Sequence, residues 1–261
     1  MERCLASLQW CDAVVVLDSG SKDNTEAESK RLGAKFFMHQ QTPPFKIDQQ
    51  RNWALDQCEI ESEWVLFLDA DETVSDVLRD EIIQSCAAAD QAGYNSYELT
   101  PRYLFWGTWL KRTQGYPNWH PRLLKRSEVR FTGGVWEHFD ERAIIGRIET
   151  PYDHYANSKG FSDWLQRHDR YSSWDAEKIV DFLECGSAES LNTSRKLKLR
   201  LLAARFWPLR PVARFCHMYF GRLGFIEGRA AFVFCLLYAY YEFMTVVKII
   251  ELKRTRKGLP L

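Results

Sequence analysis

Residues 64–72 read WVLFLDADE, a strongly apolar run that ends in acidic residues. The apolar part predicts a buried strand, and Asp69 and Asp71 follow at its open end. Because side chains alternate along an extended chain, these two carboxylates point to one face. Hard oxygen ligands of this kind suit Mg²⁺ or Mn²⁺ that also binds a substrate phosphate. The alternative is an acidic strand-to-helix turn in which Asp71 or Thr73 caps the helix.

A second strand and turn lie upstream. Residues 13–17, AVVVL, form a short apolar run typical of a parallel sheet, and DSGSKDNT follows at residues 18–25. Asp18 therefore stands at the carboxyl end of a strand, where Gly20 permits a tight turn. Asp23 or Thr25 can cap the helix that follows. Ligands of open α/β sheets bind at such strand ends, so both turns are candidates for one site.

Together the two motifs resemble glycosyltransferase family 2, whose members carry an Asp-Ser-Gly-Ser-x-Asp-x-Thr turn and, about fifty residues later, an Asp-x-Asp. Between them, QQRNWAL at residues 49–55 is similar to a family helix with a basic residue before Asn-x-Ala. The resemblance implies an α/β fold: a GT-A type, Rossmann-like nucleotide-sugar-binding domain with a mainly parallel sheet.

The resemblance also implies roles for individual residues. Asp18 would contact uracil or another base, and Arg51 would lie near the nucleotide. Asp69 and Asp71 would hold a Mg²⁺ or Mn²⁺ ion and the ribose or diphosphate. The nucleotide-sugar-binding set implied in this way is Asp18, Ser19, Asp23, Arg51 and Asp69.

The likeness extends to a narrower group, the bacterial membrane-associated enzymes that add sugars to lipopolysaccharide core and similar glycolipids. Residues 116–126, YPNWHPRLLKR, are similar to that group's Pro-Asp-x-x-x-Arg-Leu-Phe-Arg-Arg segment, and VWE at 135–137 stands where the group has Val-His-Glu. Residues 218–230 and 238–243 look like its closing signature. By the same resemblance His154 would lie close to the diphosphate and its metal; the alternative is a structural histidine.

The beginning of the sequence departs from the family pattern. Family members open with an apolar strand and a turn that touches the base, whereas this sequence opens inside the following helix, at residues 2–8. Met1 is then an internal methionine mistaken for a start, or the chain has lost a central strand. Loss of a central strand would leave two unpaired strand edges and remove part of the base pocket.

Composition narrows the class further. The 261 residues carry 35 basic and 35 acidic side chains, so no long-range attraction to nucleic acid is expected. The seven cysteines are scattered and odd in number, which favours reduced thiols in the cytosol over a disulfide framework or a zinc site. No signal peptide opens the sequence.

Changes in composition predict three regions. Residues 1–149 would form the GT-A catalytic domain without its first strand, 150–189 a helical extension, and 190–261 basic and hydrophobic helices that associate with a membrane. Within the first region, residues 94–148 are aromatic and predict an antiparallel extension. Its rings are expected in the core, although some could stack on an acceptor sugar.

Two segments of the third region suit a lipid surface. Residues 190–226 hold eight Lys or Arg and no acidic residue among many apolar ones, and residues 230–247 contain a single charge, Glu242. We expect a shallow or re-entrant hydrophobic helix at the cytoplasmic face of the inner membrane rather than a clean span, since basic residues flank it on both sides. A solvated basic face packed on the domain is the alternative.

The predicted reaction is transfer of a sugar from a nucleotide-diphosphate donor to a hydroxyl of a glycolipid or lipopolysaccharide-core acceptor. The expected donor is a UDP-sugar, and the transfer is expected to invert the anomeric carbon. The metal would be held through Asp71, with Asp69 assisting. Glu137 is the candidate base, because it lies in the region where the family places that group. Its competitors are His138, Asp140 and Glu141.

Two other functions stay open at this point. A polyprenyl-phosphate sugar transferase would share the donor site but would not be expected to carry the Arg-Leu-Gly-Phe segment at residues 222–225. A non-catalytic, membrane-docked degenerate transferase would explain the missing strand, whereas the intact acidic residues argue against it.

Overall fold

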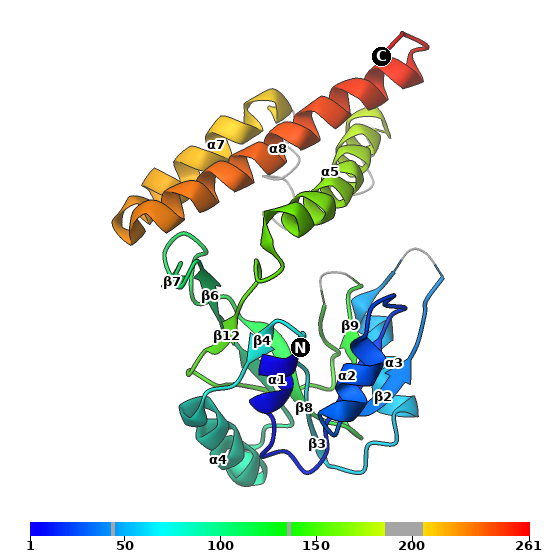
Figure 1. Ribbon diagram of the computed structural model, residues 1–261, viewed down its shortest axis with the longest axis vertical. Helices are drawn as coiled ribbons and strands as arrows, with labels where there is room; N and C mark the ends of the chain where they lie inside the picture. Colours follow the sequence, from blue (N-terminus) through cyan, green and yellow to red (C-terminus); the bar gives the residue numbers. More distant parts are fainter. Residues whose placement is uncertain (43–44, 135–136, 186–205) are drawn as a thin grey trace. The chain divides into compact units, whose positions relative to one another are not determined.

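The computed structural model describes residues 1–42, 45–134, 137–185 and 206–261 (Figure 1). Two compact units make up the chain. The first comprises Met1–Leu104 and Tyr116–Ala156, and the second comprises Phe105–Gly115 and Asn157–Leu261. The second unit therefore includes the short segment Phe105–Gly115 in addition to the C-terminal helices.

The helices of the first unit are α1 (Glu2–Ala6), α2 (Thr25–Arg31), α3 (Ile47–Gln57) and α4 (Asp76–Ala92). The sequence marks both ends of α4. The Ser75 hydroxyl accepts the Leu78 N–H at 3.3 Å, and Gly93 ends the helix in a left-handed conformation with φ of 74°. The Ser75 cap fixes the start of α4 at Asp76, with three residues between it and the acidic run of residues 69–72.

The first unit holds a central four-stranded sheet in the order β11-β5-β8-β3. Its strands are β3 (Trp64–Leu66), β5 (Ser96–Leu99), β8 (His120–Lys125) and β11 (Ile145–Arg147). β8 runs antiparallel to both β3 and β5, whereas β11 runs parallel to β5. The sheet is thus mixed, and the expectation of a mainly parallel sheet needs correction. The reason is that β8, from the aromatic segment, enters between β3 and β5 against their direction.

Smaller sheets complete the unit. β1 (Val15–Asp18) pairs in parallel with β2 (Lys35–Met38). β12 (Tyr152–His154) pairs antiparallel with β4 (Glu72–Thr73) and parallel with β6 (Pro101–Phe105). A short antiparallel ladder joins β9 (Phe131–Thr132) and β10 (His138–Phe139). The β4–β12 pairing places His154 opposite Glu72, and so brings the predicted histidine to the acidic run.

The two strands that precede the predicted motifs lie at the edges of their sheets. Among the described residues β1 pairs with β2 alone, and β3 pairs with β8 alone. Both strands precede acidic turns, so each of the two predicted motifs follows an edge strand of its sheet.

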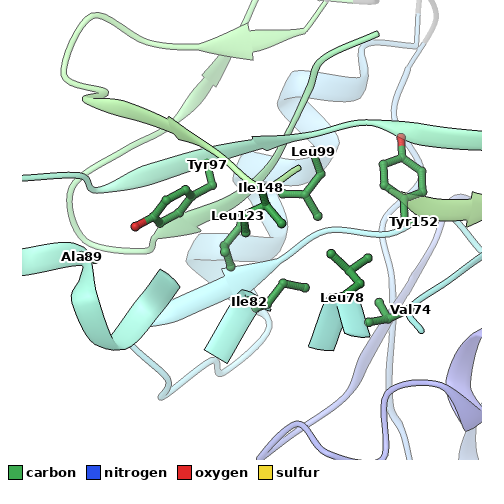
Figure 2. Packing of buried hydrophobic residues seen from close by; sticks show 9 residues of the cluster. All are labelled: Val74, Leu78, Ile82, Ala89, Tyr97, Leu99, Leu123, Ile148 and Tyr152. Carbon is green, nitrogen blue, oxygen red and sulfur yellow. The ribbon is translucent and has the colours of Figure 1, made fainter. Parts of the chain in front are cut away.

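Apolar side chains cover both faces of the central sheet. On one face α4 contributes Leu78 and Ile82 to a buried cluster with Leu123 of β8 (Figure 2). On the other, Leu55 of α3 packs with Leu124 of β8. Because neighbouring residues of a strand point to opposite faces, Leu123 and Leu124 tie β8 into both layers. This packing fixes the strand ends that carry the acidic residues.

The second unit is mainly helical. Its elements are β7 (Thr108–Trp109), α5 (Gly160–Cys185), the 3-10 turn η2 (Trp207–Leu209), α7 (Arg210–Cys216), the π turn η3 (His217–Gly221), the 3-10 turn η4 (Gly224–Glu227) and α8 (Gly228–Arg256). α8 packs against both α5 and α7 (Figure 1). Within the described ranges one helical stretch, Gly224–Arg256, is long and apolar enough to cross a membrane by length and composition.

Part of the predicted basic segment, residues 190–205, lies outside the described residues, as do Val135 and Trp136 before the candidate base. The remainder of the predicted hydrophobic region forms α7, the two turns η3 and η4, and α8.

Candidate active site

The acidic run after β3 folds into a closed turn. The Asp69 N–H donates to Oε2 of Glu72 at 2.9 Å, and the Glu72 N–H donates to the Asp69 carbonyl at 2.9 Å. The apolar β3 therefore ends at a fixed point, from which Asp69 and Asp71 are presented in sequence. Glu72 is fully buried and holds this turn from within.

Two arginines face the carboxylate of Asp69. Nη2 of Arg51 lies 3.5 Å from Oδ1, and Nη2 of Arg122 lies 3.3 Å from Oδ2. Desolvation among the surrounding atoms works against ionisation, but Arg122 and Arg51 outweigh it and lower the pKa of Asp69 to about 2. The Asp69 side chain nevertheless keeps 48% of its surface open to solvent, so a ligand can reach it.

Arg122 forms a buried network behind Asp69. Its Nη2 donates to Oε1 of Glu72 at 2.7 Å and to the Tyr152 hydroxyl at 3.3 Å. Burial raises the pKa of Glu72 to about 7 even though Arg122 opposes this shift. Nε and Nη1 of Arg122 are buried without a hydrogen-bond partner in the described part of the chain. Buried N–H groups without a partner are available to donate hydrogen bonds to a water molecule or to an acceptor group of a ligand.

The candidate base Glu137 shares an arginine with Asp69. Its Oε1 lies 3.0 Å from Nη2 of Arg51, and its side chain is only 10% exposed. Burial raises the pKa of Glu137, while Arg51 and Arg122 partly oppose that shift. Oε2 of Glu137 is buried and has no partner among the described residues, so one carboxylate oxygen can still accept a proton.

Helix α3 determines where Glu137 lies. The Asn52 side chain accepts the Phe131 N–H at 2.9 Å and donates to the Phe131 carbonyl at 2.8 Å, which docks β9 on the helix. The Gly134 N–H donates to Asp48 at 2.9 Å. The Arg-Asn pair of the predicted helix therefore performs two tasks: Arg51 enters the site, and Asn52 holds the segment that leads to Glu137.

Asp71 faces His154 across the β4–β12 ladder. Nε2 of His154 lies 3.6 Å from Oδ2 of Asp71. Burial lowers the pKa of His154, but Asp71 and Glu72 outweigh it, so the net shift is upward. Burial raises the pKa of Asp71, but the interaction with His154 outweighs it, so the net shift is downward. Neither oxygen of Asp71 contacts an arginine in the described residues, which distinguishes Asp71 from Asp69.

The Asp18 turn forms the second part of the site. Asp18 is buried, and its carboxylate accepts N–H groups of Gly20 at 2.8 Å and Ser21 at 2.7 Å and the Ser21 hydroxyl at 2.5 Å. These bonds outweigh partial burial and lower the pKa of Asp18. Gly20 has φ of 103°, a conformation that glycine adopts readily. The turn is thus held by its own carboxylate.

One glutamine connects the two parts. Nε2 of Gln50, the residue before Arg51 on α3, donates to the Ser19 hydroxyl at 3.2 Å and to the His39 carbonyl at 2.9 Å. Asp23 lies farther along the turn, where its carboxylate accepts the Thr25 N–H at 3.1 Å. Contacts therefore join Arg51, Asp69 and Glu137 into one group and Asp71 and His154 into another, with Asp18, Ser19 and Asp23 on the adjoining turn.

Sequence reasoning did not single out Glu72, Arg122 or Tyr152. Glu72 stood in the acidic run as a third carboxylate, and Arg122 stood in the YPNWHPRLLKR segment without a role. A signal was present, because an arginine directly before the apolar pair Leu123 and Leu124 of a buried strand needs an anionic partner. Which residue is that anionic partner depends on the β3–β8 pairing. The pairing sets Leu66 opposite Leu123 and so brings Arg122 to the end of β3.

The carboxylates of the site bear on whether it can hold a divalent cation. The described residues contain no group of three or more His, Cys, Asp or Glu side chains arranged to hold a metal. Mg²⁺ and Mn²⁺ sites that use substrate phosphates need only one or two carboxylates. Asp69, Glu72 and Glu137 each contact Arg51 or Arg122, whereas the ion pair of Asp71 is with His154, so the charge of Asp71 is the one that a divalent cation would offset. Asp71, clear of the arginines, fits best as the protein ligand.

Comparison with known proteins identifies the family. The model of glycosyl transferase family 2 matches residues 1–132. Lipopolysaccharide core biosynthesis glycosyltransferase LpsC of Rhizobium meliloti is 24% identical over 253 residues, which cover 95% of this chain and 86% of LpsC. The uncharacterized glycosyltransferase RT0209 of Rickettsia typhi is 26% identical over 251 residues, covering 92% of this chain and 78% of the relative.

The chain is therefore a glycosyltransferase with a GT-A type α/β fold. It belongs to glycosyltransferase family 2. This confirms the resemblance drawn from the two acidic motifs. Family membership implies a nucleotide-sugar donor and a glycoconjugate acceptor, and enzymes of this family commonly use a divalent cation.

Proposed function

We propose that this enzyme transfers a sugar from a UDP-sugar to a hydroxyl of a glycolipid or lipopolysaccharide-core acceptor, with inversion at the anomeric carbon. The observation that carries the proposal is the position of Arg51, whose guanidinium contacts both Asp69 of the acidic turn and the candidate base Glu137. A single side chain thus links the donor end of the site to a carboxylate that can take a proton.

Glu137 is the proposed general base. Its carboxylate takes the proton of the acceptor hydroxyl as the acceptor oxygen bonds to the anomeric carbon and the bond to the diphosphate breaks. Burial raises the pKa of Glu137 above its usual value, which brings the proton affinity of the carboxylate closer to that of the hydroxyl it serves. Arg51 keeps the carboxylate ionised and oriented, because it lies 3.0 Å away and is itself buried.

Asp71, with Asp69 assisting, is proposed to hold Mg²⁺ or Mn²⁺ together with the donor diphosphate, and His154 borders that position. A divalent cation there would neutralise the charge that develops on the leaving diphosphate. Asp18, Ser19 and Asp23 are proposed to bind the nucleotide. Arg51 and Arg122 lie beside the two oxygens of Asp69 and lower the pKa of that carboxyl to about 2, so it is ionised at neutral pH.

The relatives and the C-terminal helices support the proposed acceptor and location. LpsC, which resembles this chain over most of its length, is named for lipopolysaccharide core biosynthesis. The apolar stretch Gly224–Arg256 is compatible with a lipid surface. We therefore place the enzyme at the cytoplasmic face of the inner membrane, where a glycolipid acceptor and a soluble nucleotide sugar meet.

Calorimetric titration of UDP, with and without Mn²⁺, tests the donor site. We expect binding that requires Mn²⁺ and that the Asp71→Ala variant loses. Asp76→Ala, at an exposed carboxylate on α4, serves as the matched control and should bind as the unsubstituted chain does. UDP binding that is indifferent to Mn²⁺ would contradict the metal assignment, and binding of another nucleotide in its place would contradict the donor.

A further inference from the structure

Helix α8 carries an exposed apolar stripe. Six apolar side chains recur at intervals of three or four residues, and each is at least 37% exposed; they are Phe232, Leu236, Tyr240, Phe243, Val247 and Ile250. Positions with this spacing lie on one face of an α-helix. From Phe232 to Ile250 the stripe covers 19 residues, a length of about 27 Å at the rise of an α-helix. A helix surface of this length and character needs an apolar environment.

The opposite face of α8 is already occupied by the second unit. Glu242, 3% exposed, accepts hydrogen bonds from Arg210 at 2.7 Å and from Arg214 at 2.8 and 2.9 Å, both of α7. Ile249 is fully buried against Ala176 and Val180 of α5. The single acidic residue of the apolar segment is therefore neutralised within the unit, and the exposed stripe carries no charge.

Polar contacts with α5 continue along the second half of α8. Lys248 donates to the carboxylate of Asp169 at 2.6 Å and to Ser173 at 2.8 Å. Farther on, Arg256 donates to Asp181 at 2.6 Å. α5 itself carries nine charged residues among its 26. A transmembrane orientation of α8 would draw these charges into hydrocarbon, which membranes strongly disfavour.

The charges around the stripe are mostly positive. Residues 206–261 hold nine Lys or Arg side chains against three Glu. At 100° per residue, Arg229 and Arg254 fall on the same face of α8 as the stripe, one before it and one after it. Two copies of this surface would repel each other, whereas the head groups of anionic lipids would be attracted. Charge complementarity therefore favours a bilayer surface over a second copy of the chain.

We propose that α8 lies in the plane of an anionic bilayer surface, with the stripe from Phe232 to Ile250 immersed and α5 turned toward water. The proposal rests on the membrane location given under the proposed function and specifies the face and orientation involved. Arg210 and Arg214 act as positioning residues for this surface, because their guanidinium groups pair with the carboxylate of Glu242 and neutralise its charge on the apolar helix.

Vesicle flotation and spin-label depth measurements test the proposal on the full chain. Vesicles of phosphatidylglycerol and phosphatidylcholine should carry the chain, and the double variant Leu236→Glu, Phe243→Glu should lower binding at least tenfold. Val77→Glu, Ile83→Glu, at exposed apolar positions of α4 in the first unit, is the matched control and should bind normally. Titration of each variant with UDP reports separately on the donor site.

Labels on cysteines placed at positions 232, 236, 243 and 250 distinguish the orientations, with the unsubstituted chain giving the background of its own thiols. Equal immersion depth at all four positions is the expected result. A label depth that is greatest at position 243 and least at positions 232 and 250 would show that α8 spans the bilayer, and it would overturn the proposal. So would a failure to bind vesicles, or labels shielded in a soluble dimer; UDP binding in those cases would leave the transferase assignment standing.

Discussion

Nη2 of Arg51 lies 3.0 Å from Oε1 of Glu137. The two residues are 86 positions apart, on α3 and directly before β10, and both side chains are largely buried. The same nitrogen lies 3.5 Å from Asp69. Arg51 therefore sets the separation between the candidate base and the acidic turn, and its geometry should control the rate of transfer more than the affinity for donor.

The Arg51→Lys variant tests this role. Lysine keeps the charge but lacks the planar fork that reaches two carboxylates at once, so Glu137 should shift. We expect kcat/KM to fall about 100-fold, a loss typical of a misplaced catalytic group. Arg31→Lys, at an exposed position of α2, should leave kcat/KM unchanged. An unimpaired Arg51→Lys enzyme would show that Arg51 does not position the base.

Removal of the base should separate binding from chemistry. Glu137→Gln preserves the shape of the side chain but cannot accept the proton, so turnover should fall by about 10² to 10⁴ while UDP binding persists. Glu141→Gln changes a neighbouring exposed carboxylate in the same way and should stay active. Transfer assays and UDP titrations on both variants provide the measurement, and an active Glu137→Gln enzyme would reject the assignment.

The pH dependence of kcat/KM should carry an acid limb from Glu137. Burial raises the pKa of Glu137 above 4.5, and the base works only when ionised, so the rate should rise with pH through a value above 4.5. Asp69, with a pKa of about 2, and Asp71, whose pKa is lowered, are ionised throughout this range. The residual activity of Glu137→Gln should lack this limb. A limb that persists would point to a different base or to Glu72, whose pKa burial raises to about 7.

The buried pair of Arg122 and Glu72 should matter for stability. Replacing either partner alone leaves an uncompensated charge, so Arg122→Met or Glu72→Met should each lower the free energy of unfolding by about 3–5 kcal/mol. The double replacement should cost less than the sum of the two, because it leaves neither charge behind. Urea denaturation of the four chains measures this coupling, and strictly additive losses would show that the pair is not coupled.

Much of the site could be predicted from the sequence because its residues follow strands. Apolar runs at residues 13–17 and 64–68 predicted strands, and the structure has β1 and β3 there. Arg51 was expected near the nucleotide, and the structure places it against Asp69. Local patterns suffice where the side chain and the strand end are adjacent in the chain.

The arrangement of β8 could not be predicted in this way. Its insertion between β3 and β5 depends on pairing between residues far apart in the chain, and strand order leaves no local periodicity. For the same reason the Arg122–Glu72 pair went unrecognised, since its partners lie 50 residues apart. The neutralisation of Glu242 by Arg210 and Arg214 likewise becomes visible only when α7 lies beside α8 (Figure 1).

Among the described residues β1 pairs with β2 alone, which affects how the site responds to its ligand. A two-stranded ribbon is marginally stable by itself, and the Asp18 turn stands at the end of this one. Amide hydrogens of β1 and β2 should therefore exchange with solvent faster than those of β5 and β8, which lie inside the four-stranded sheet. A nucleotide bound at the Asp18 turn would slow that exchange, so the donor would contribute part of the rigidity of its own binding site.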